Sequence, residues 1–323
     1  MTFRIKFAKY GVVRFIGHLD VMRYFQKVIR RSGLPVSYSQ GFSPHQLMSF
    51  ALPLSVGVTS DGEYMEVEFE EDKLVEAAAR NMLPGDLTDG SKTELMDELS
   101  VGSKTALSGE LSDGVRADTT ADTTLKSQAD MKYILEKYIF EGLSANTTEG
   151  FAIFGVEQLP KPEPNKHVDK AMALVSAADY MISIKDGYED AVGFASQDEL
   201  IGEFEKFIGQ EMIEVTKKTK KNENRLNLKE FIYGYGDEKF LSNGTNSCDI
   251  SAAGAGIAHA RRFRNGMHLI LRLAAGSRMN IKPEMVLEAF LGSLGREYDE
   301  NAFATHRIEL FMGEPGNLRP LIG

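Results

Sequence analysis

The order of strand and helix patterns in residues 1–160 constrains the fold of this chain more than any other feature. Residues 3–9 read FRIKFAK, where apolar and basic side chains alternate with the period of two that a β-strand requires. Apolar residues at helical spacing follow over residues 19–32, and Gly33 then ends the helix. The later patterns predict strands at 47–58 and 63–71 joined by a TSDG turn, a helix at 73–82 and a strand at 151–159.

This order of strand, helix, two strands, helix and strand is typical of a ferredoxin-like domain, an antiparallel sheet with both helices on one face. The second half of the chain repeats the order with one extra strand. The sequence therefore predicts an α+β protein made of tandem ferredoxin-like (βαββαβ) domains. In the second half we expect strands at 180–184, 211–219, 225–235, 267–273 and 306–312, with helices at 198–208 and 282–293.

The length of 323 residues accommodates two domains, each with its own core. We expect an N-terminal domain at 1–160, a proline-containing linker at 161–170 and a C-terminal domain at 171–323. Residues 84–130 carry ten acidic and four basic side chains and no aromatic one, so they are predicted to be a disordered acidic insertion. Residues 238–266 predict a long irregular loop.

Cysteine usage and motif content exclude several classes of protein. Cys248 is the single cysteine, which excludes an internal disulfide and fits a reducing cytoplasm. No apolar run approaches a membrane span, so we expect a cytoplasmic protein without a membrane partner. The six histidines lack metal-ligand spacing, and the common nucleotide-binding and radical-SAM cluster motifs are missing, which predicts no cofactor and no metal.

The charge of the chain is unevenly distributed. The net charge is −10, but residues 1–60 hold eight basic side chains against the single acid Asp20. A locally basic segment indicates a nucleic-acid partner despite the acidic total. The candidate nucleic-acid-binding residues are Arg4, Lys6, Arg14, Arg23, Lys27, Arg30, Arg31, Lys217, Lys218, Lys220, Lys221, Arg261, Arg262 and Arg264.

Three local patterns support this interpretation. Four of the basic residues, at 23, 27, 30 and 31, form one stripe on the first predicted helix. In the segment HARRFRNG, at 259–266, arginines flank Phe263, as suits a single strand whose bases stack on rings. The turn before the last helix offers Arg278 and Lys282 to an anion. The alternatives are a solvated helix face and lysines that serve only solubility.

Residues 38–50, YSQGFSPHQLMSF, are the best candidate for a pocket. The loop combines aromatic side chains with glycine, proline and histidine directly after a helix, and we expect it to fold over the start of that helix. Two histidines beside a basic groove could cleave RNA by acid–base chemistry, although capping or packing of the helix start by His18 and turn hydrogen bonds of His45 are the preferred explanation. The candidate pocket residues are Gly17, His18, Asp20, Ser39, Gln40, Gly41, Phe42, Pro44 and His45, with His18 and His45 as candidate catalytic groups.

The blocks GHLD, RRSGLPVSYSQGF and PH in residues 3–70 resemble a bacterial radical-SAM-linked family of uncharacterised proteins. This resemblance implies a protein fused to, or encoded beside, a radical-SAM protein with a cobalamin-binding-type domain. It supplies no catalytic residues, because no activity is established for that family. The chain differs from the family pattern at Gln46, where proline is usual, and in its acidic insertion. The matching positions are Gly17, His18, Leu19, Asp20, Arg31, Ser39, Gln40, Gly41, Phe42, Pro44, His45 and Glu63.

Three functions are compatible with these features. The first is a non-enzymatic RNA-binding accessory protein that acts with a radical-SAM partner in RNA or ribosome-related modification or processing. The second is a metal-independent endoribonuclease that uses His18 and His45. The third is a protein-interaction module that docks the radical-SAM protein without RNA.

Overall fold

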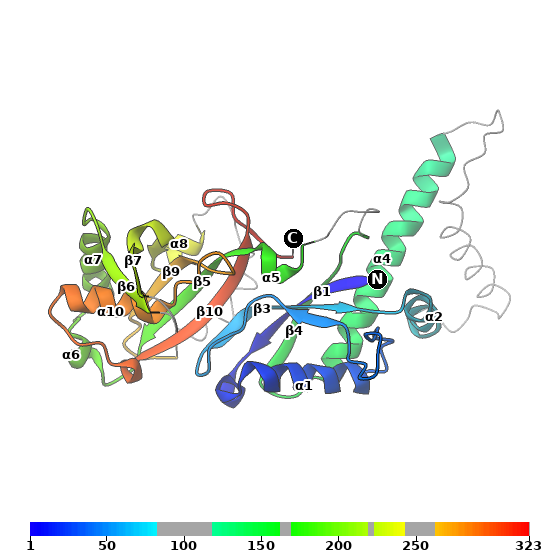
Figure 1. Ribbon diagram of the computed structural model, residues 1–323, viewed down its shortest axis with the longest axis horizontal. Helices are drawn as coiled ribbons and strands as arrows, with labels where there is room; N and C mark the ends of the chain where they lie inside the picture. Colours follow the sequence, from blue (N-terminus) through cyan, green and yellow to red (C-terminus); the bar gives the residue numbers. More distant parts are fainter. Residues whose placement is uncertain (83–117, 162–168, 219–222, 243–261, 323) are drawn as a thin grey trace.

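The computed structural model describes residues 1–82, 118–161, 169–218, 223–242 and 262–322. The protein is a mixed α+β protein with a mostly antiparallel sheet. The first half contains, in chain order, β1 (Thr2–Lys9), the 3-10 helix η1 (Gly11–Phe15), α1 (His18–Arg31), β2 (Met48–Phe50), β3 (Thr59–Glu68), α2 (Glu71–Met82), α4 (Asp118–Asn146) and β4 (Phe151–Gln158) (Figure 1).

The second half begins after the predicted linker, of which residues 162–168 lie outside the described residues. Its elements are α5 (Ala171–Leu174), β5 (Val175–Ile184), α6 (Glu189–Val192), α7 (Gln197–Ile208), β6 (Glu214–Lys218), β7 (Glu223–Asn227), η3 (Leu228–Phe231), β8 (Ile232–Gly236), α8 (Glu238–Ser242), β9 (His268–Ala274), α10 (Pro283–Ser293), η4 (Glu300–Ala302), β10 (Phe303–Met312) and β11 (Arg319–Pro320).

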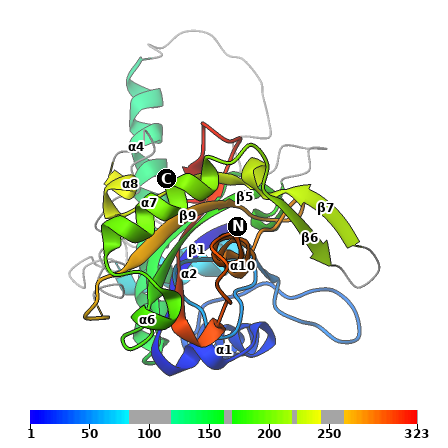
Figure 2. The ribbon, with the colours of Figure 1, turned by 90° about the vertical axis from the view of Figure 1, so that its left-hand side faces the viewer.

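One sheet joins the two halves. Among the described residues it has nine strands in the order β4-β1-β3-β10-β5-β9-β8, with β2 on β3 and β11 on β10. Within each half all neighbouring strands are antiparallel. In the first half the order is fourth, first, third and second, and the second half has the same order once the β6–β7 hairpin and β11 are set aside. The short parallel pairing of β3 with β10 connects the halves. The β6–β7 hairpin forms a separate two-stranded sheet that projects sideways (Figure 2).

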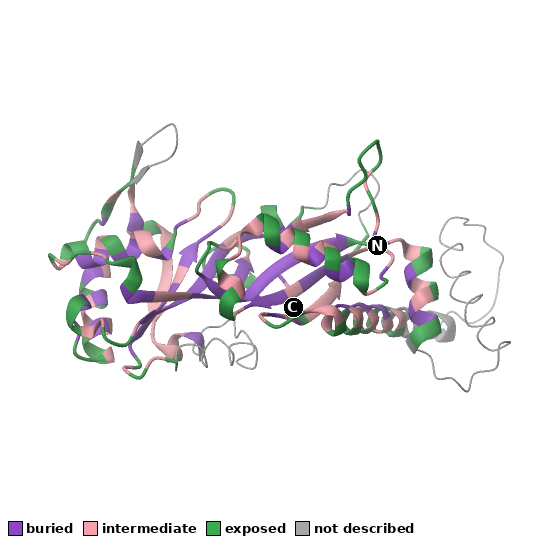
Figure 3. Ribbon diagram, turned by 90° about the horizontal axis from the view of Figure 1, so that it is seen from below, coloured by how far each residue is buried: buried purple, intermediate pink, exposed green. Residues whose placement is uncertain are grey.

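Each half packs helices on one face of its strands. In the first half, Phe25 of α1 and Leu135 of α4 join Phe3 and Phe7 of β1 in one buried cluster. In the second half, Phe204 of α7 and Phe290 of α10 meet at 5.0 Å between ring centroids. Figure 3 shows the strands as a buried band between more exposed helices and loops. These cores hold the surface loops in fixed positions.

The predicted turn at residues 59–62 is wrong, because these residues begin strand β3. Gly62 explains the difference. A Cβ at this position would lie 2.5 Å from the Cα of Glu309 and 2.7 Å from the carbonyl oxygen of Ile308. Only glycine allows the backbones of β3 and β10 to approach this closely. The predicted strand at 47–58 is correspondingly shorter, since only Met48–Phe50 pair with β3.

Helix α4 was missed in the sequence, and it starts inside the range predicted to be a disordered insertion. Residues 84–117 of that range lie outside the described residues. Leu135, Ile139 and Leu143 are fully buried and recur every four residues, which is the period of a helix face. The helical signal was therefore present just after the low-complexity stretch. The predicted loop at 238–266 likewise begins with α8, and residues 243–261 lie outside the described residues.

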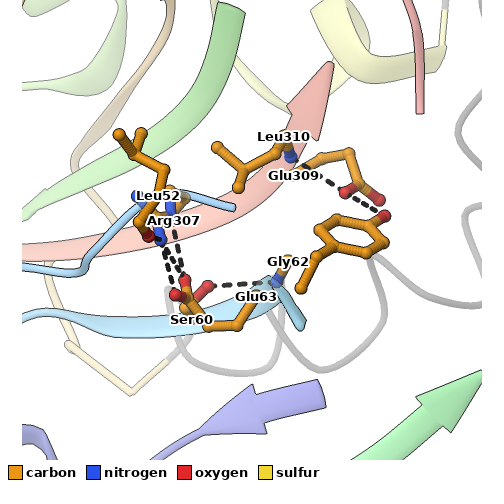
Figure 4. Close-up of polar contacts among 8 residues, drawn as sticks. Leu52, Ser60, Gly62, Glu63, Arg307, Glu309 and Leu310 are labelled. Atoms are coloured by element: carbon orange, nitrogen blue, oxygen red, sulfur yellow. Dashed lines mark hydrogen bonds and ion pairs between the residues drawn. The ribbon is translucent and has the colours of Figure 1, made fainter. Parts of the chain in front are cut away.

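Buried ion pairs line the seam between the halves. The Arg307 guanidinium donates to Glu63 through Nε at 2.9 Å and through Nη2 at 2.5 and 2.6 Å (Figure 4). Arg307 also donates to the carbonyl oxygen of Leu52 at 2.8 Å. Tyr64 donates to the carboxylate of Glu309 at 2.6 Å. These pairs tie β3 of the first half to β10 of the second.

Candidate nucleic-acid interface

A cavity of about 560 Å³ lies between the two halves. Its first-half wall consists of η1 and the loop before β3, which are joined by a 2.8 Å hydrogen bond from the Gly57 N–H to the carbonyl oxygen of Arg14. Its second-half wall consists of the end of β5, the start of α10 and the start of β10. The lining residues that carry the argument are Arg14, Phe15, Lys185, Arg262, Phe263 and Glu284.

Three cationic side chains line this cavity, one from the first half and two from the second. Arg14 follows β1, Lys185 follows β5, and Arg262 precedes β9. Two of them lie over rings: the Arg14 guanidinium is 4.5 Å from the Phe15 ring centroid, and that of Arg262 is 5.9 Å from the Phe263 centroid. The structure thus brings two predicted nucleic-acid-binding arginines, distant in sequence, to one cavity.

Lys185 was not predicted from the sequence. Its Nζ donates to the carbonyl oxygen of Asn301 at 2.8 Å. Burial lowers the pKa of Lys185, the positive charges of Arg14 and Arg262 lower it further, and Asp299 opposes them. Burial is the main cause, and the smaller effect of Arg14 and Arg262 shows that three cations lie close enough to repel, a repulsion that an anion would relieve. A single lysine after an apolar strand carries no such signal in the sequence.

The basic stripe on α1 lies at the surface, as expected for a phosphate-binding face. Arg23, Lys27, Arg30 and Arg31 are all exposed. Arg23 pairs with Asp20 at 3.2 Å, and Arg31 donates to the carbonyl oxygen of Asn146 at 2.8 Å. Exposed pairs of this kind are weak, so they leave the side chains able to exchange partners.

Arg4 and Lys6 were predicted to bind nucleic acid from an exposed sheet face, and the structure corrects this. Arg4 is 4% exposed; it pairs with Glu66 at 2.8 Å and donates to the carbonyl oxygen of Leu321 at 2.7 Å. Lys6 pairs with Glu309. The face carrying both residues is covered because the second half and its C-terminal segment pack against it. A buried, paired cation is not available to a phosphate.

The candidate catalytic histidines have different neighbours. The His18 ring packs edge-on against Phe50 at 5.2 Å, and it lines a small cavity with Lys9 and Glu63. His45 lies in another cavity, between its own loop and the start of the chain. Its Nδ1 is 2.8 Å from the hydroxyl of Ser39, which also accepts from the His45 N–H at 3.1 Å. These contacts are those of a packed histidine and of a turn.

The segment 38–50 contacts α1 at its start, where Phe50 packs against His18, and in its middle. Gln46 is buried and donates to the carbonyl oxygen of Gln26 at 3.3 Å. Gln26 lies eight residues after His18, which is about 12 Å along a helix. Phe42, at the far end of the loop, is fully exposed. The remaining predicted pocket residues are half-buried or exposed: Gly17, Asp20, Ser39, Gln40, Gly41 and Pro44.

The other predicted basic residues are more scattered. Lys217 and Lys218 belong to β6, whereas Lys220, Lys221 and Arg261 lie outside the described residues. The remaining three, Arg264, Arg278 and Lys282, are exposed.

The described part of the chain holds no cluster of three or more histidine, cysteine, aspartate or glutamate side chains suited to a metal ion. Within the same residues, every helix is too short or too polar to span a bilayer.

These features define a mixed α+β protein with a cationic, aromatic-lined cavity between its halves. The chain belongs to a bacterial family described as "Uncharacterized protein conserved in bacteria (DUF2344)", whose sequence pattern matches residues 2–112 and 118–283. A comparison with curated proteins gave no match. The family description names no partner, so the association with a radical-SAM protein stays a prediction.

Proposed function

We propose that this protein is an RNA-binding accessory protein that presents single-stranded RNA to a radical-SAM partner. The observation that carries the RNA part is the placement of Arg14, Lys185 and Arg262 around one cavity beside Phe15 and Phe263. Cations hold phosphates and rings stack on bases, and this combination is what sequence-tolerant single-strand binding requires. The exposed stripe on α1 adds further phosphate contacts.

The test is fluorescence anisotropy with a labelled single-stranded RNA over a series of salt concentrations. For single strands the logarithm of affinity falls with the logarithm of salt by about 0.7 per neutralised phosphate. We expect Arg262→Ala to reduce this slope by about 0.7 and to weaken binding. Arg319→Ala removes an exposed arginine of the same half from outside the cavity and serves as the matched control. Salt-independent affinity, or equal slopes for both variants, would contradict the proposal.

The fold assignment that accompanies this function is a tandem ferredoxin-like protein. The strand order of fourth, first, third and second supports it, and the second half repeats this order apart from the β6–β7 hairpin and β11. The helices packed on one face of each half support it too. An experimental structure with a different strand order in either half would refute the assignment.

A second candidate function is docking of the radical-SAM protein without RNA. Four large apolar side chains near η1 are 59–82% exposed, which favours a protein partner over an unoccupied surface. They are Val12, Phe15, Leu19 and Val56. Leu19→Asp should abolish co-purification of the partner from nuclease-treated extract, and Met212→Asp, at an equally exposed site on the other half, should not. Unchanged co-purification with Leu19→Asp would reject this surface.

The endoribonuclease alternative predicts that His18→Ala or His45→Ala stops RNA cleavage. The separate cavities of the two rings do not favour it. We expect both variants to bind RNA like the natural protein and to leave it intact. Metal-independent cleavage that disappears in either variant would establish the alternative.

A further inference from the structure

Two acidic side chains, Glu284 and Glu300, lie among the cations of the cavity. Glu284 is the second residue of α10 and lines the cavity together with Lys185 and Arg262. Its Oε2 atom is buried and has no hydrogen-bond partner among the described residues. A buried carboxylate oxygen without a donor is costly. A ligand that donates hydrogen bonds to Glu284 would remove this cost.

The charge of Glu284 also affects the pKa of neighbouring tyrosine hydroxyls. Burial raises the pKa of the Tyr298 hydroxyl to about 12, and the charge of Glu284 is the next cause. Burial also raises the pKa of Tyr180, and Glu284 adds to that effect. The negative charge of Glu284 therefore acts on Tyr298, which lines the cavity, and on Tyr180, which does not.

Whereas Glu284 needs a hydrogen-bond donor, the cationic side chains of Arg14, Lys185 and Arg262 need an anion. Lys185 uses one of its three N–H donors for the carbonyl oxygen of Asn301, and its two cationic neighbours repel it. These groups favour an anion. The cavity thus calls for a ligand with a negative end and a hydrogen-bond-donating end, joined by a part flat enough to lie against Phe263 or Phe303. Its volume of about 560 Å³ lies within the usual range for small-ligand sites.

We propose that this cavity binds one unpaired guanine nucleotide, with its phosphate at Arg14, Lys185 and Arg262 and its base edge at Glu284. Guanine presents two adjacent donors, N1–H and the N2 amino group, which match the two oxygens of a carboxylate. Adenine and cytosine place an acceptor next to their amino group, and uracil flanks its single N–H with two carbonyls. The carboxylate therefore selects guanine. This inference rests on the proposed RNA binding, in which the nucleotide belongs to a strand.

The experiment is isothermal titration of the full chain with 5′-GMP, 5′-IMP, 5′-AMP, 5′-CMP and 5′-UMP at low salt. We expect GMP to bind at least tenfold more tightly than the other four, since IMP lacks the N2 amino group. Glu284→Gln replaces one acceptor oxygen with a donor and should abolish the preference for GMP, while affinity for inorganic phosphate persists. Arg262→Ala should weaken all five nucleotides, and Arg319→Ala, at an exposed position outside the cavity, should change none. A thermal melt of each variant confirms that it is folded.

The outcomes separate this inference from the proposed function. Equal affinity for the five nucleotides, or a GMP preference that survives Glu284→Gln, overturns the guanine site. If single-stranded RNA still binds with a salt-dependent affinity, the proposed function stands without it. If GMP binds selectively and RNA does not bind, the guanine site stands and the ligand is a free nucleotide.

Discussion

The buried pair between Arg307 and Glu63 offers the sharpest test of how the two halves are joined. Arg307 is 1% exposed and Glu63 5% exposed, so neither charge is solvated. Replacing Arg307 with methionine keeps most of the aliphatic volume but removes three hydrogen bonds to Glu63 and one to the carbonyl oxygen of Leu52. Breaking a buried pair by removing one partner costs about 3–5 kcal/mol.

Because Lys9 lies nearby, we expect a loss of stability at the lower end of that range. Lys9 lies beside the pair; burial lowers its pKa, the charge of Glu63 raises it and the charge of Arg307 lowers it. Without Arg307, Lys9 partly neutralises the stranded carboxylate. We therefore expect Arg307→Met to lower the free energy of unfolding by about 3 kcal/mol, a large share of the 5–15 kcal/mol typical of a folded domain.

The assay is urea denaturation followed by circular dichroism at neutral pH. The double variant Arg307→Met/Glu63→Met removes both charges, and with them two opposing influences on Lys9, so it should recover most of the loss. Arg30→Met, at an exposed position on α1, should change stability by less than about 0.5 kcal/mol. A loss below about 1 kcal/mol for Arg307→Met, or a double variant less stable than the single one, would refute the reasoning.

Three further predictions concern packing and charge. Gly62→Ala forces β3 and β10 apart and should lower stability by about 1–3 kcal/mol, whereas Gly202→Ala in open space on α7 should raise it by about 0.5–1 kcal/mol. Ile139→Ala in α4 should cost about 2–5 kcal/mol and expose the helix to limited proteolysis, because its side chain is fully buried. The lowered pKa of Lys185 means that folding disfavours its charged form. Stability should therefore rise as pH increases from that lowered pKa towards 10.5, and Lys185→Met should flatten the rise.

Each of these three predictions can be contradicted by a specific result. Equal urea midpoints for the two glycine variants would reject the close approach of the strands. A proteolysis pattern unchanged by Ile139→Ala would mean that α4 is not held by its buried face. An alkaline rise in stability that persists in Lys185→Met would assign it to another group.

The sequence by itself determined several local elements and their order, but not helix α4 or the start of β3. Alternation in residues 3–9 and helical spacing in residues 19–32 are local signals, and both segments adopt the expected structure. The exposed stripe on α1 also followed from spacing, because the residues that pack inwards leave the others outside.

Only the tertiary structure decided how the halves meet and which basic residues remain available. The parallel pairing of β3 with β10 depends on Gly62, whose role appears only when another backbone lies against it. The same contact buries Arg4 and Lys6. The alternation of apolar and basic residues in this strand was predicted correctly, but the exposure of the basic side chains was not. The cavity brings Arg14, Lys185 and Arg262 together across the fold, and no spacing in the sequence encodes a contact between residues this far apart. Long-range contacts follow from packing rather than from local pattern.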